Sequence, residues 1–348
     1  MTRDEFFMHA PRAFSEQELY ERRREPRLNY NDQYGWYAST RVENLTKFYD
    51  TVAHGPMADH WAASHRLAND CTALLRLQYS AGDSIDSLRA FYPTAIWAWE
   101  EHVRHLDNWY QGEDFVRSFS TRSPALSFTD DEYGLFVLPM LCFGLLLGHA
   151  DLMPRLCACW DYINDEIDCF DQLVEALVAP LVPGRHRHAR TYTRHLPYRK
   201  LDKVFRAAPD KRPALMARYL DEWYHASRRE PGHGMHHDLM FKGYWSFEAA
   251  AVAWAFDIDD TTFRDMDFYP RDLADYARSR FPRAGVTTAG LFAMSGEPCP
   301  RSGRWSPRAD GPLADVHVAQ GRPMPMAEWR DASGQFHQHA VRWQWVAA

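Results

Sequence analysis

The segment Lys242–Phe281 has the sequence KGYWSFEAAAVAWAFDIDDTTFRDMDFYPRDLADYARSRF. Its first part, Tyr244–Phe256, is almost wholly apolar and predicts a buried helix. We expect an acidic turn and a short second helix to follow, and a third helix to begin at Pro270, where a missing N–H costs no hydrogen bond. The acidic turn carries Asp257, Asp259 and Asp260. This segment is predicted to form the centre of a helical core.

One carboxylate, Glu248, interrupts the apolar helix between Phe247 and Ala249. A half-buried carboxylate tends to have a raised pKa and could act as a general acid or base. More often such a group accepts hydrogen bonds from a nearby turn or pairs with an arginine. No second carboxylate or histidine has the spacing that completes a catalytic pair, so we expect Glu248 to be structural.

The composition narrows the class of protein. With 348 residues the chain can bury a sizeable core, and its 14% aromatic content argues against extended disorder. A net charge of −7 argues against a general nucleic-acid-binding protein, which is usually basic, and permits a partner with a basic surface. The six cysteines are scattered through predicted helices, as in a reduced cytosolic protein.

The chain shows neither a secretion signal nor a membrane span. Its N-terminus, MTRDEFFMHAPRAF, lacks a continuous apolar run. The most hydrophobic segment, Leu135–Gly148, is about half as long as a membrane span and contains Pro139, so it predicts a buried helix. We expect a soluble, cytoplasmic protein.

Hydrophobic periodicity indicates a mainly α protein with two parts. Residues 1–283 predict a helical domain of about ten helices, orthogonal or bundle-like, with an N-terminal part at 15–110 and a second part at 130–283. After Phe281, helical periodicity gives way to short alternating runs. Residues 284–348 therefore predict a small β-rich module of about five strands, with an SH3-like arrangement as one option.

A predicted helix, Pro154–Leu177, carries five carboxylates near one face. Between Asp130 and Glu175, ten acidic residues stand against one basic residue, whereas Arg185–Glu230 holds thirteen Lys or Arg against five acids. The acidic face is either solvated or neutralised by the basic segment, or it mimics phosphate and occupies the basic cleft of a nucleic-acid enzyme. The five carboxylates are Asp161, Asp165, Asp168, Asp171 and Glu175.

A histidine-rich segment, Gly232–Asp238, resembles a metal-ligand cluster. His233 and His237 have the i,i+4 spacing of helical zinc ligands, but Gly234 weakens a helix there. We expect a polar loop and no metal. The sequence also lacks GxGxxG, Walker, GxSxG and HExxH motifs, so it gives an enzyme little support and predicts no cofactor.

Four motifs resemble those of PoNi-type immunity proteins. The family's G-Y-W-x-F-E-A-A-A-V helix matches Gly243–Val252, its I-D-D turn matches Ile258–Asp260, and its Y-P-x-D-L run matches Tyr269–Leu273. Its Y-S-x-G-x-S-I element is similar to Tyr79–Ile85. These proteins are the cognate inhibitors of PoNe nuclease toxins, which type VI secretion and related polymorphic toxin systems deliver. The resemblance covers roughly residues 15–281.

The resemblance implies a stoichiometric, non-catalytic inhibitor that needs no cofactor or metal. Its partner would be an effector toxin, a DNase of the PD-(D/E)xK kind, whose active-site cleft it would cover. The largely apolar family signature would then be core, and the toxin would contact the five carboxylates near one helix face, with the acidic turn as a secondary candidate. The structural signature residues are Tyr244, Trp245, Glu248, Tyr269, Pro270 and Asp272.

Two alternatives stay open at this point. The tail motifs CPRSGRW (Cys299–Trp305) and GRPMP (Gly321–Pro325) resemble a module on some immunity proteins, so the chain could give immunity to a non-nuclease toxin through that module. The other alternative is a helical metal-dependent hydrolase that uses Glu248 with His233 and His237. We expect no direct contact with nucleic acid or membrane, and the sequence leaves the oligomeric state open.

Overall fold

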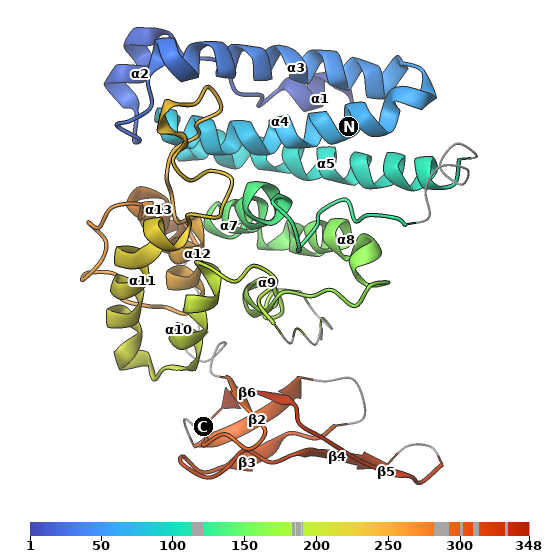
Figure 1. Cartoon of the computed structure of the whole chain (residues 1–348), viewed down its shortest axis with the longest axis vertical. Coiled ribbons are helices and arrows are strands. Elements are labelled where there is room, and N and C mark those ends of the chain that lie inside the picture. Colours follow the sequence, from blue (N-terminus) through green and yellow to red (C-terminus); the bar gives the residue numbers. More distant parts are fainter. Residues whose placement is uncertain are drawn as a thin grey trace.

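The computed structural model describes residues 1–112, 121–182, 185, 189, 191–281, 292–299, 302–308, 313–330 and 333–347. Within these ranges, α-helices dominate the chain as far as Phe281, and short strands follow (Figure 1). The predicted mainly α fold with a small β-rich appendage is confirmed. The α-helices are α1 (Arg3–Phe7), α2 (Glu16–Arg22), α3 (Gly35–His54), α4 (His60–Ala81), α5 (Ile85–Tyr110), α7 (Leu138–Leu146), α8 (Met153–Asn164), α9 (Gln172–Val178), α10 (Asp202–Arg206), α11 (Arg212–Ala226), α12 (Phe247–Ala255) and α13 (Arg271–Arg280).

The three longest helices lie side by side, with α4 between α3 and α5 (Figure 1). A tight turn separates α4 from α5. Gly82 ends α4 with φ +91°, and an added Cβ there would collide with the backbone of Arg22, so the turn requires glycine. Ser84 then begins α5, because its hydroxyl accepts the N–H of Ser87 at 3.0 Å.

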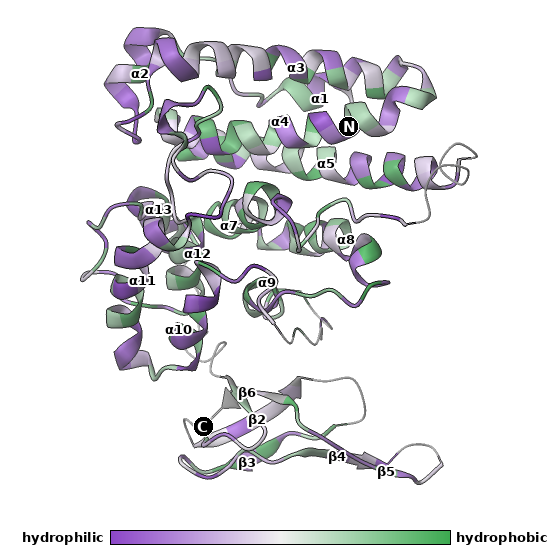
Figure 2. Ribbon diagram, viewed as in Figure 1, coloured by the Kyte–Doolittle hydropathy of each residue, from purple (hydrophilic) through white to green (hydrophobic). Residues whose placement is uncertain are grey.

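Two helices that lie within the core of the helical part, α7 and α12, pack against each other and are mostly hydrophobic (Figure 2). Every residue of both helices is buried, and the rings of Phe143 and Phe247 lie 4.7 Å apart. The predicted buried helices at Leu135–Gly148 and in the opening segment are therefore observed. In the described ranges, no helix combines the length and the apolar character that a membrane span requires.

The opening segment differs from the prediction in two places. The apolar helix is shorter, since α12 covers only Phe247–Ala255, and the short second helix does not form. Instead, the carbonyl of Asp260 accepts the N–H groups of Phe263 and Arg264 in a single turn, and Phe268 takes φ +69°, which a continuing helix does not allow. As expected, the next helix begins next to Pro270.

The prediction of one continuous helix over Pro154–Leu177 is wrong, because the structure divides this segment into α8 and α9. Ile163 has φ +66° and ends α8, and Asp168, with φ +50°, lies in the turn that follows. Asp171 then takes an extended conformation as the N-cap of α9. The five carboxylates therefore do not line one helix face.

The β-rich appendage has a hydrophobic cluster of its own, which includes the buried Trp305 and Trp343. Its strands form an antiparallel sheet in the order β1-β6-β2-β3 and a β4–β5 hairpin. Arg206 of α10 forms an ion pair with Glu297, at 2.5 Å, which links the appendage to the helices. The predicted domain boundary at 283/284 lies outside the described residues. The strands are β1 (Phe292–Met294), β2 (Gly303–Arg308), β3 (Val316–Val318), β4 (Ala327–Arg330), β5 (Phe336–His339) and β6 (Arg342–Ala347).

Candidate functional site

Asp171 is completely buried, unlike a residue that meets a partner at the surface. Its Oδ1 accepts the N–H groups of Leu173 at 2.9 Å and Val174 at 3.1 Å, and the hydroxyl of Tyr133 at 2.8 Å. Its Oδ2 accepts the N–H of Thr193 at 2.8 Å. Burial raises the pKa of Asp171, although these hydrogen bonds oppose the shift. The side chain fixes the start of α9 against two other segments.

Asp161 and Glu175 form ion pairs with Arg185 from the basic segment. The Nε and Nη2 atoms of Arg185 donate to the two carboxylate oxygens of Glu175 at 2.9 and 2.6 Å, and Nη1 and Nη2 donate to Asp161 at 2.7 and 2.9 Å. The side chains of Arg185 and Glu175 are each only 4% exposed. The acidic and basic segments therefore touch, and one arginine pairs with two of the five carboxylates, so that its single positive charge offsets one of their two negative charges.

Asp165 and Asp168 are the members of the five that are exposed. They lie in the turn between α8 and α9, together with Glu166, which pairs with Arg122, and Ile167, which is 54% exposed. We call residues 165–168 the acidic turn between α8 and α9. Contact with a toxin stays a prediction for all five carboxylates, but in this conformation Asp165 and Asp168 are the two that a partner could reach most directly.

The secondary candidates for toxin contact, the carboxylates of the turn after α12, also differ in exposure. Asp257 and Asp259 are exposed, whereas Asp260 is buried. Asp260 forms an ion pair with Arg278 and accepts the hydroxyl of Tyr269 at 3.0 Å. Its carboxylate therefore joins the turn after α12 to the region of α13, and Asp257 and Asp259 are left as the surface members of this group.

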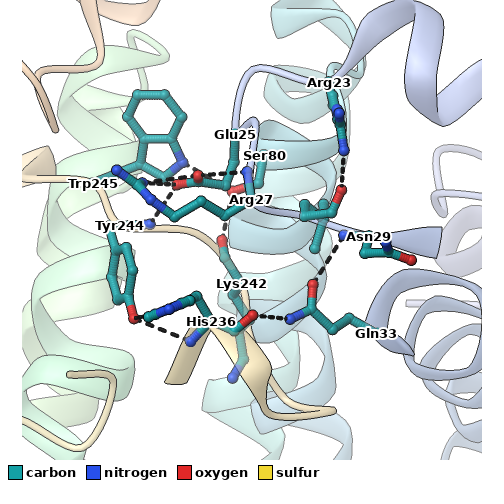
Figure 3. A network of polar contacts seen from close by, with 11 residues as sticks. Arg23, Glu25, Arg27, Asn29, Gln33, Ser80, His236, Lys242, Tyr244 and Trp245 are labelled. Atoms are coloured by element: carbon teal, nitrogen blue, oxygen red, sulfur yellow. Dashed lines mark hydrogen bonds and ion pairs between the residues drawn. The ribbon is translucent and has the colours of Figure 1, made fainter. Parts of the chain in front are cut away.

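Tyr244 and Trp245 join the loop before α12 to the N-terminal helices (Figure 3). The N–H of Tyr244 donates to Glu25 at 3.0 Å, and Glu25 is buried. The indole N–H of Trp245 donates to the hydroxyl of Ser80 in α4 at 2.9 Å, and this hydroxyl in turn donates to the carbonyl of Lys242. These bonds hold the loop before α12 against α4 and the N-terminal part of the chain.

Asp272 connects two family motifs that are far apart in sequence. It accepts the hydroxyl of Tyr79 at 2.5 Å and pairs with Arg24. Tyr79 and Ser80 begin the motif Tyr79–Ile85, whereas Trp245 and Asp272 belong to the C-terminal motifs. The motifs thus meet at the junction of α4 with the segments around α12 and α13.

Glu248 is buried and accepts three hydrogen bonds on one oxygen atom. The donors to Oε1 are the hydroxyl of Tyr219 at 2.7 Å, the indole N–H of Trp223 at 2.7 Å and the hydroxyl of Ser246 at 2.8 Å. Burial raises the pKa of Glu248, and these bonds act in the opposite direction. The geometry supports the structural reading, because the carboxylate ties α11 to the start of α12.

The histidine-rich segment forms a polar loop with a short 3₁₀ turn at Met235–His237. The ring of His233 lies 4.3 Å from that of Tyr224, in a tilted arrangement. His233 also lines a cavity of about 70 Å³ that Glu248 lines as well, whereas His237 does not line this cavity. Among the residues that the structure describes, no group of three or more His, Cys, Asp or Glu could hold a metal ion. The Glu248–His233–His237 site of the hydrolase alternative is therefore not assembled.

Sequence reasoning missed the two groups that organise these contacts, Arg185 and Glu25. The reversal of charge after Glu175 was a signal for the first, because it predicted that the two segments could neutralise each other. No local pattern indicates the second, since Glu25 and Tyr244 are separated by 219 positions in the chain.

Two family descriptions match most of the helical part of the chain. The PoNe immunity protein (PoNi) N-terminal description matches residues 60–158, and the PoNe immunity protein C-terminal description matches residues 169–273. The chain belongs to the PoNe immunity protein family. The resemblance found in the sequence is thereby confirmed, and an immunity protein of this family binds a cognate toxin.

The fold of this PoNi family member is also similar to a solved structure. The crystal structure of protein PA2201 from Pseudomonas aeruginosa matches with a TM-score of 0.59 and 23% sequence identity, over 76% of this chain and 95% of that chain. At this identity the similarity concerns the fold alone. No curated protein matches the chain. The β-rich appendage lies beyond residue 273, outside both PoNi matches.

Proposed function

We propose that this PoNi family member is a stoichiometric, non-catalytic inhibitor of a nuclease toxin. It acts in the cytoplasm of the producing cell and its kin, and the toxin is one that a type VI secretion system or a related polymorphic toxin system delivers. The observation that carries the proposal is the pair of PoNi matches. The net charge of −7 is a second support, because a DNase presents a positive cleft to DNA phosphates.

The proposed contact surface is centred on the acidic turn between α8 and α9. Asp165 and Asp168 would occupy positions that DNA phosphates take on the toxin, and the exposed Ile167 would add apolar contact. Asp161, Asp171 and Glu175 would act indirectly, because their bonds to Arg185 and to α9 hold the turn in place. Asp257 and Asp259 form a second acidic surface that the toxin could also contact.

Co-expression with the toxin encoded beside this gene tests the proposal. We expect the two proteins to co-purify and the wild-type chain to restore growth. The variant Asp165→Lys/Asp168→Lys should lose protection, whereas Glu43→Lys/Asp210→Lys, which changes the charge equally at two other exposed sites, should retain it. Full protection by both variants would show that the toxin contacts another surface.

The β-rich appendage supports a second candidate, immunity to a non-nuclease toxin through this module. It has its own hydrophobic cluster and lies outside the PoNi matches, and Phe336 in its β4–β5 hairpin is 52% exposed. Removal of residues 284–348 separates the candidates once circular dichroism shows that the helical part still folds. Retained protection would favour the helical surface, and lost protection would favour the appendage.

A further inference from the structure

A cavity of about 250 Å³ opens between α3, α4 and the loop that leads into α12. Three basic side chains line it, one from each of these elements: Arg41 of α3, Arg76 of α4 and Lys242 of the loop. Figure 3 shows the backbone of Lys242 bound to Ser80, while its Nζ points the opposite way. The carbonyl of Lys242 is therefore held on α4, while its side chain extends toward the cavity.

Tyr37 brings two of the cations together. The guanidinium of Arg41 lies 4.6 Å and the ammonium of Lys242 lies 5.3 Å from the centre of its ring. A cation over an aromatic face is stabilised by the ring, but the ring does not neutralise its charge. The cavity thus keeps two like charges close together, and an anion between them would remove their repulsion.

Two of the three basic side chains in the cavity wall have no ion-pair partner within the described part of the chain. Arg41 pairs with Asp70, but no ion pair joins Arg76 or Lys242 to a described carboxylate. The Nη1 of Arg76 has a long contact of 3.5 Å with the carbonyl of Leu135, and Lys242 donates to the carbonyl of Met240 at 3.1 Å. Of the three basic side chains, Arg41 alone has an ion-pair partner among the described residues, in a protein that is acidic overall.

Three buried polar atoms in the cavity wall have no hydrogen-bond partner among the described residues: Arg41 Nε, Arg76 Nε and Asn69 Oδ1. An unsatisfied buried polar group typically costs about 1–3 kcal/mol, and more when the group is charged. The two N–H groups would be satisfied by an acceptor in the cavity, and the Asn69 oxygen by a hydroxyl. A bound oxyanion would accept hydrogen bonds from these unsatisfied cationic donors.

We propose that this cavity binds a small organic anion, a carboxylate or phosphate group carried on an apolar body. Arg76 and Lys242 would hold the charged group, and Arg41 would donate through its Nε. The remaining wall is rich in apolar side chains and would enclose the body of the ligand. This inference does not depend on the nature of the toxin. The apolar side chains of the wall include Leu135, Phe136, Met235, Met240 and Phe241.

The titration of Lys242 gives the binding reaction a pH dependence. Burial, together with the charges of Arg76 and Arg41, lowers the pKa of Lys242 to about 7, and Asp238 and Asp70 oppose this shift. A bound anion would favour the charged ammonium. Above pH 7, binding should therefore take up a proton, and affinity should fall as the pH rises.

The anion could come from a free compound or from an acidic side chain of a bound protein. Both offer the same oxyanion, and the mouth of the cavity is formed in part by the exposed Met240. The two sources can be distinguished by whether the toxin and a small carboxylate compete for the cavity. A toxin that inserts its own carboxylate would compete with a small carboxylate for the cavity, whereas the site for a free compound would leave toxin affinity unchanged.

Benzoate is a suitable probe, because its carboxylate remains ionised between pH 6 and pH 9 while its ring fills apolar space. We expect calorimetry of the full chain to detect benzoate, and inorganic phosphate more weakly, but not the neutral analogue benzamide. Lys242→Met and Arg76→Gln should each weaken benzoate binding by about tenfold or more. Lys203→Met, at an exposed lysine of α10, is the matched control and should bind benzoate like the wild type.

The Lys242→Met variant keeps the test valid if Arg76→Gln fails to fold, because removal of a buried charge without a carboxylate partner should not destabilise the chain. It should also abolish the loss of affinity above pH 7. Equal binding of benzoate and benzamide, no benzoate binding, or unchanged affinity in a folded Lys242→Met variant would each overturn the proposal. Titration of the wild-type chain with toxin in saturating benzoate identifies the source of the anion. A weaker toxin affinity would mean that the toxin inserts its own carboxylate, and an unchanged affinity would mean that the anion is a free compound.

Discussion

Arg185 determines which acidic side chains of this protein face outward. Its guanidinium is held between Asp161 and Glu175, and burial alone would lower its pKa, but the hydrogen bonds with these carboxylates raise the pKa above the usual value. The ion pairs remove two carboxylates from the surface and stabilise the fold between α8 and α9.

Arg185→Ala should be strongly destabilising, because it removes a buried guanidinium that donates hydrogen bonds to both Asp161 and Glu175. A loss of about 3–5 kcal/mol in the free energy of unfolding is typical of such a change. Urea unfolding followed by circular dichroism measures it. Arg122→Ala, which breaks the exposed pair with Glu166, should cost about 0–1 kcal/mol, and equal losses in the two variants would contradict the account.

Glu248 should give the stability of the protein a pH dependence of defined sign. Because burial raises its pKa in the folded state, the folded state binds the proton more tightly than the unfolded state does. The contribution of Glu248 to stability is therefore greatest at low pH and falls as the pH rises from about 4.5 through the folded pKa.

Glu248→Gln removes this titration and keeps an oxygen that can accept from Tyr219, Trp223 and Ser246. The stability of the variant relative to the wild type should therefore be higher at pH 8 than at pH 4. Thermal unfolding at the two pH values measures the difference. A difference that does not change with pH would mean that Glu248 titrates normally.

At the scale of single elements, the break between α8 and α9 could not be predicted from the sequence. Apolar periodicity correctly located the buried helices around α7 and α12. It also ran without interruption from Pro154 to Leu177, because the residues on both sides of the break have helical spacing. The deciding groups, Asp171 and Asn164, form bonds to Thr193 and to Leu126, which no local pattern predicts.

The candidate site, like the helices, was predictable from the sequence only where local pattern decides the outcome. The family signature could be assigned to the core from its apolar character, and Glu248 to a structural role from its lack of a catalytic partner. The exposure of individual carboxylates could not be predicted, because it depends on long-range partners. Asp171 and Asp168 are three positions apart, yet one is buried and accepts hydrogen bonds from Tyr133 and Thr193, whereas the other is exposed.

Asp171→Ala should destabilise the start of α9 by more than an ordinary N-cap substitution. An exposed cap typically costs about 0.5–2 kcal/mol, and here the hydroxyl of Tyr133 and the N–H of Thr193 would also lose their acceptor inside the protein. Chemical denaturation should show a larger loss than for Ser84→Ala, the more accessible cap of α5. A smaller loss would contradict a structural role for Asp171.

At the scale of the whole molecule, the two oppositely charged sequence segments partly cancel each other. Arg185 reaches Asp161 and Glu175, and Arg194 reaches Asp131 at 3.3 Å. The surface charge of this region is therefore smaller than the acidic segment alone predicts. Two basic side chains, Arg76 and Lys242, line an internal cavity instead.

We propose that this PoNi family member neutralises a toxin by binding it through the acidic turn between α8 and α9. Calorimetric titration of the full chain with its toxin, at low and at high salt, tests this claim most directly. The account predicts a one-to-one complex whose affinity falls with salt and whose salt dependence is reduced in Asp165→Lys/Asp168→Lys. A complex with the same affinity and the same salt dependence in wild type and variant would contradict it.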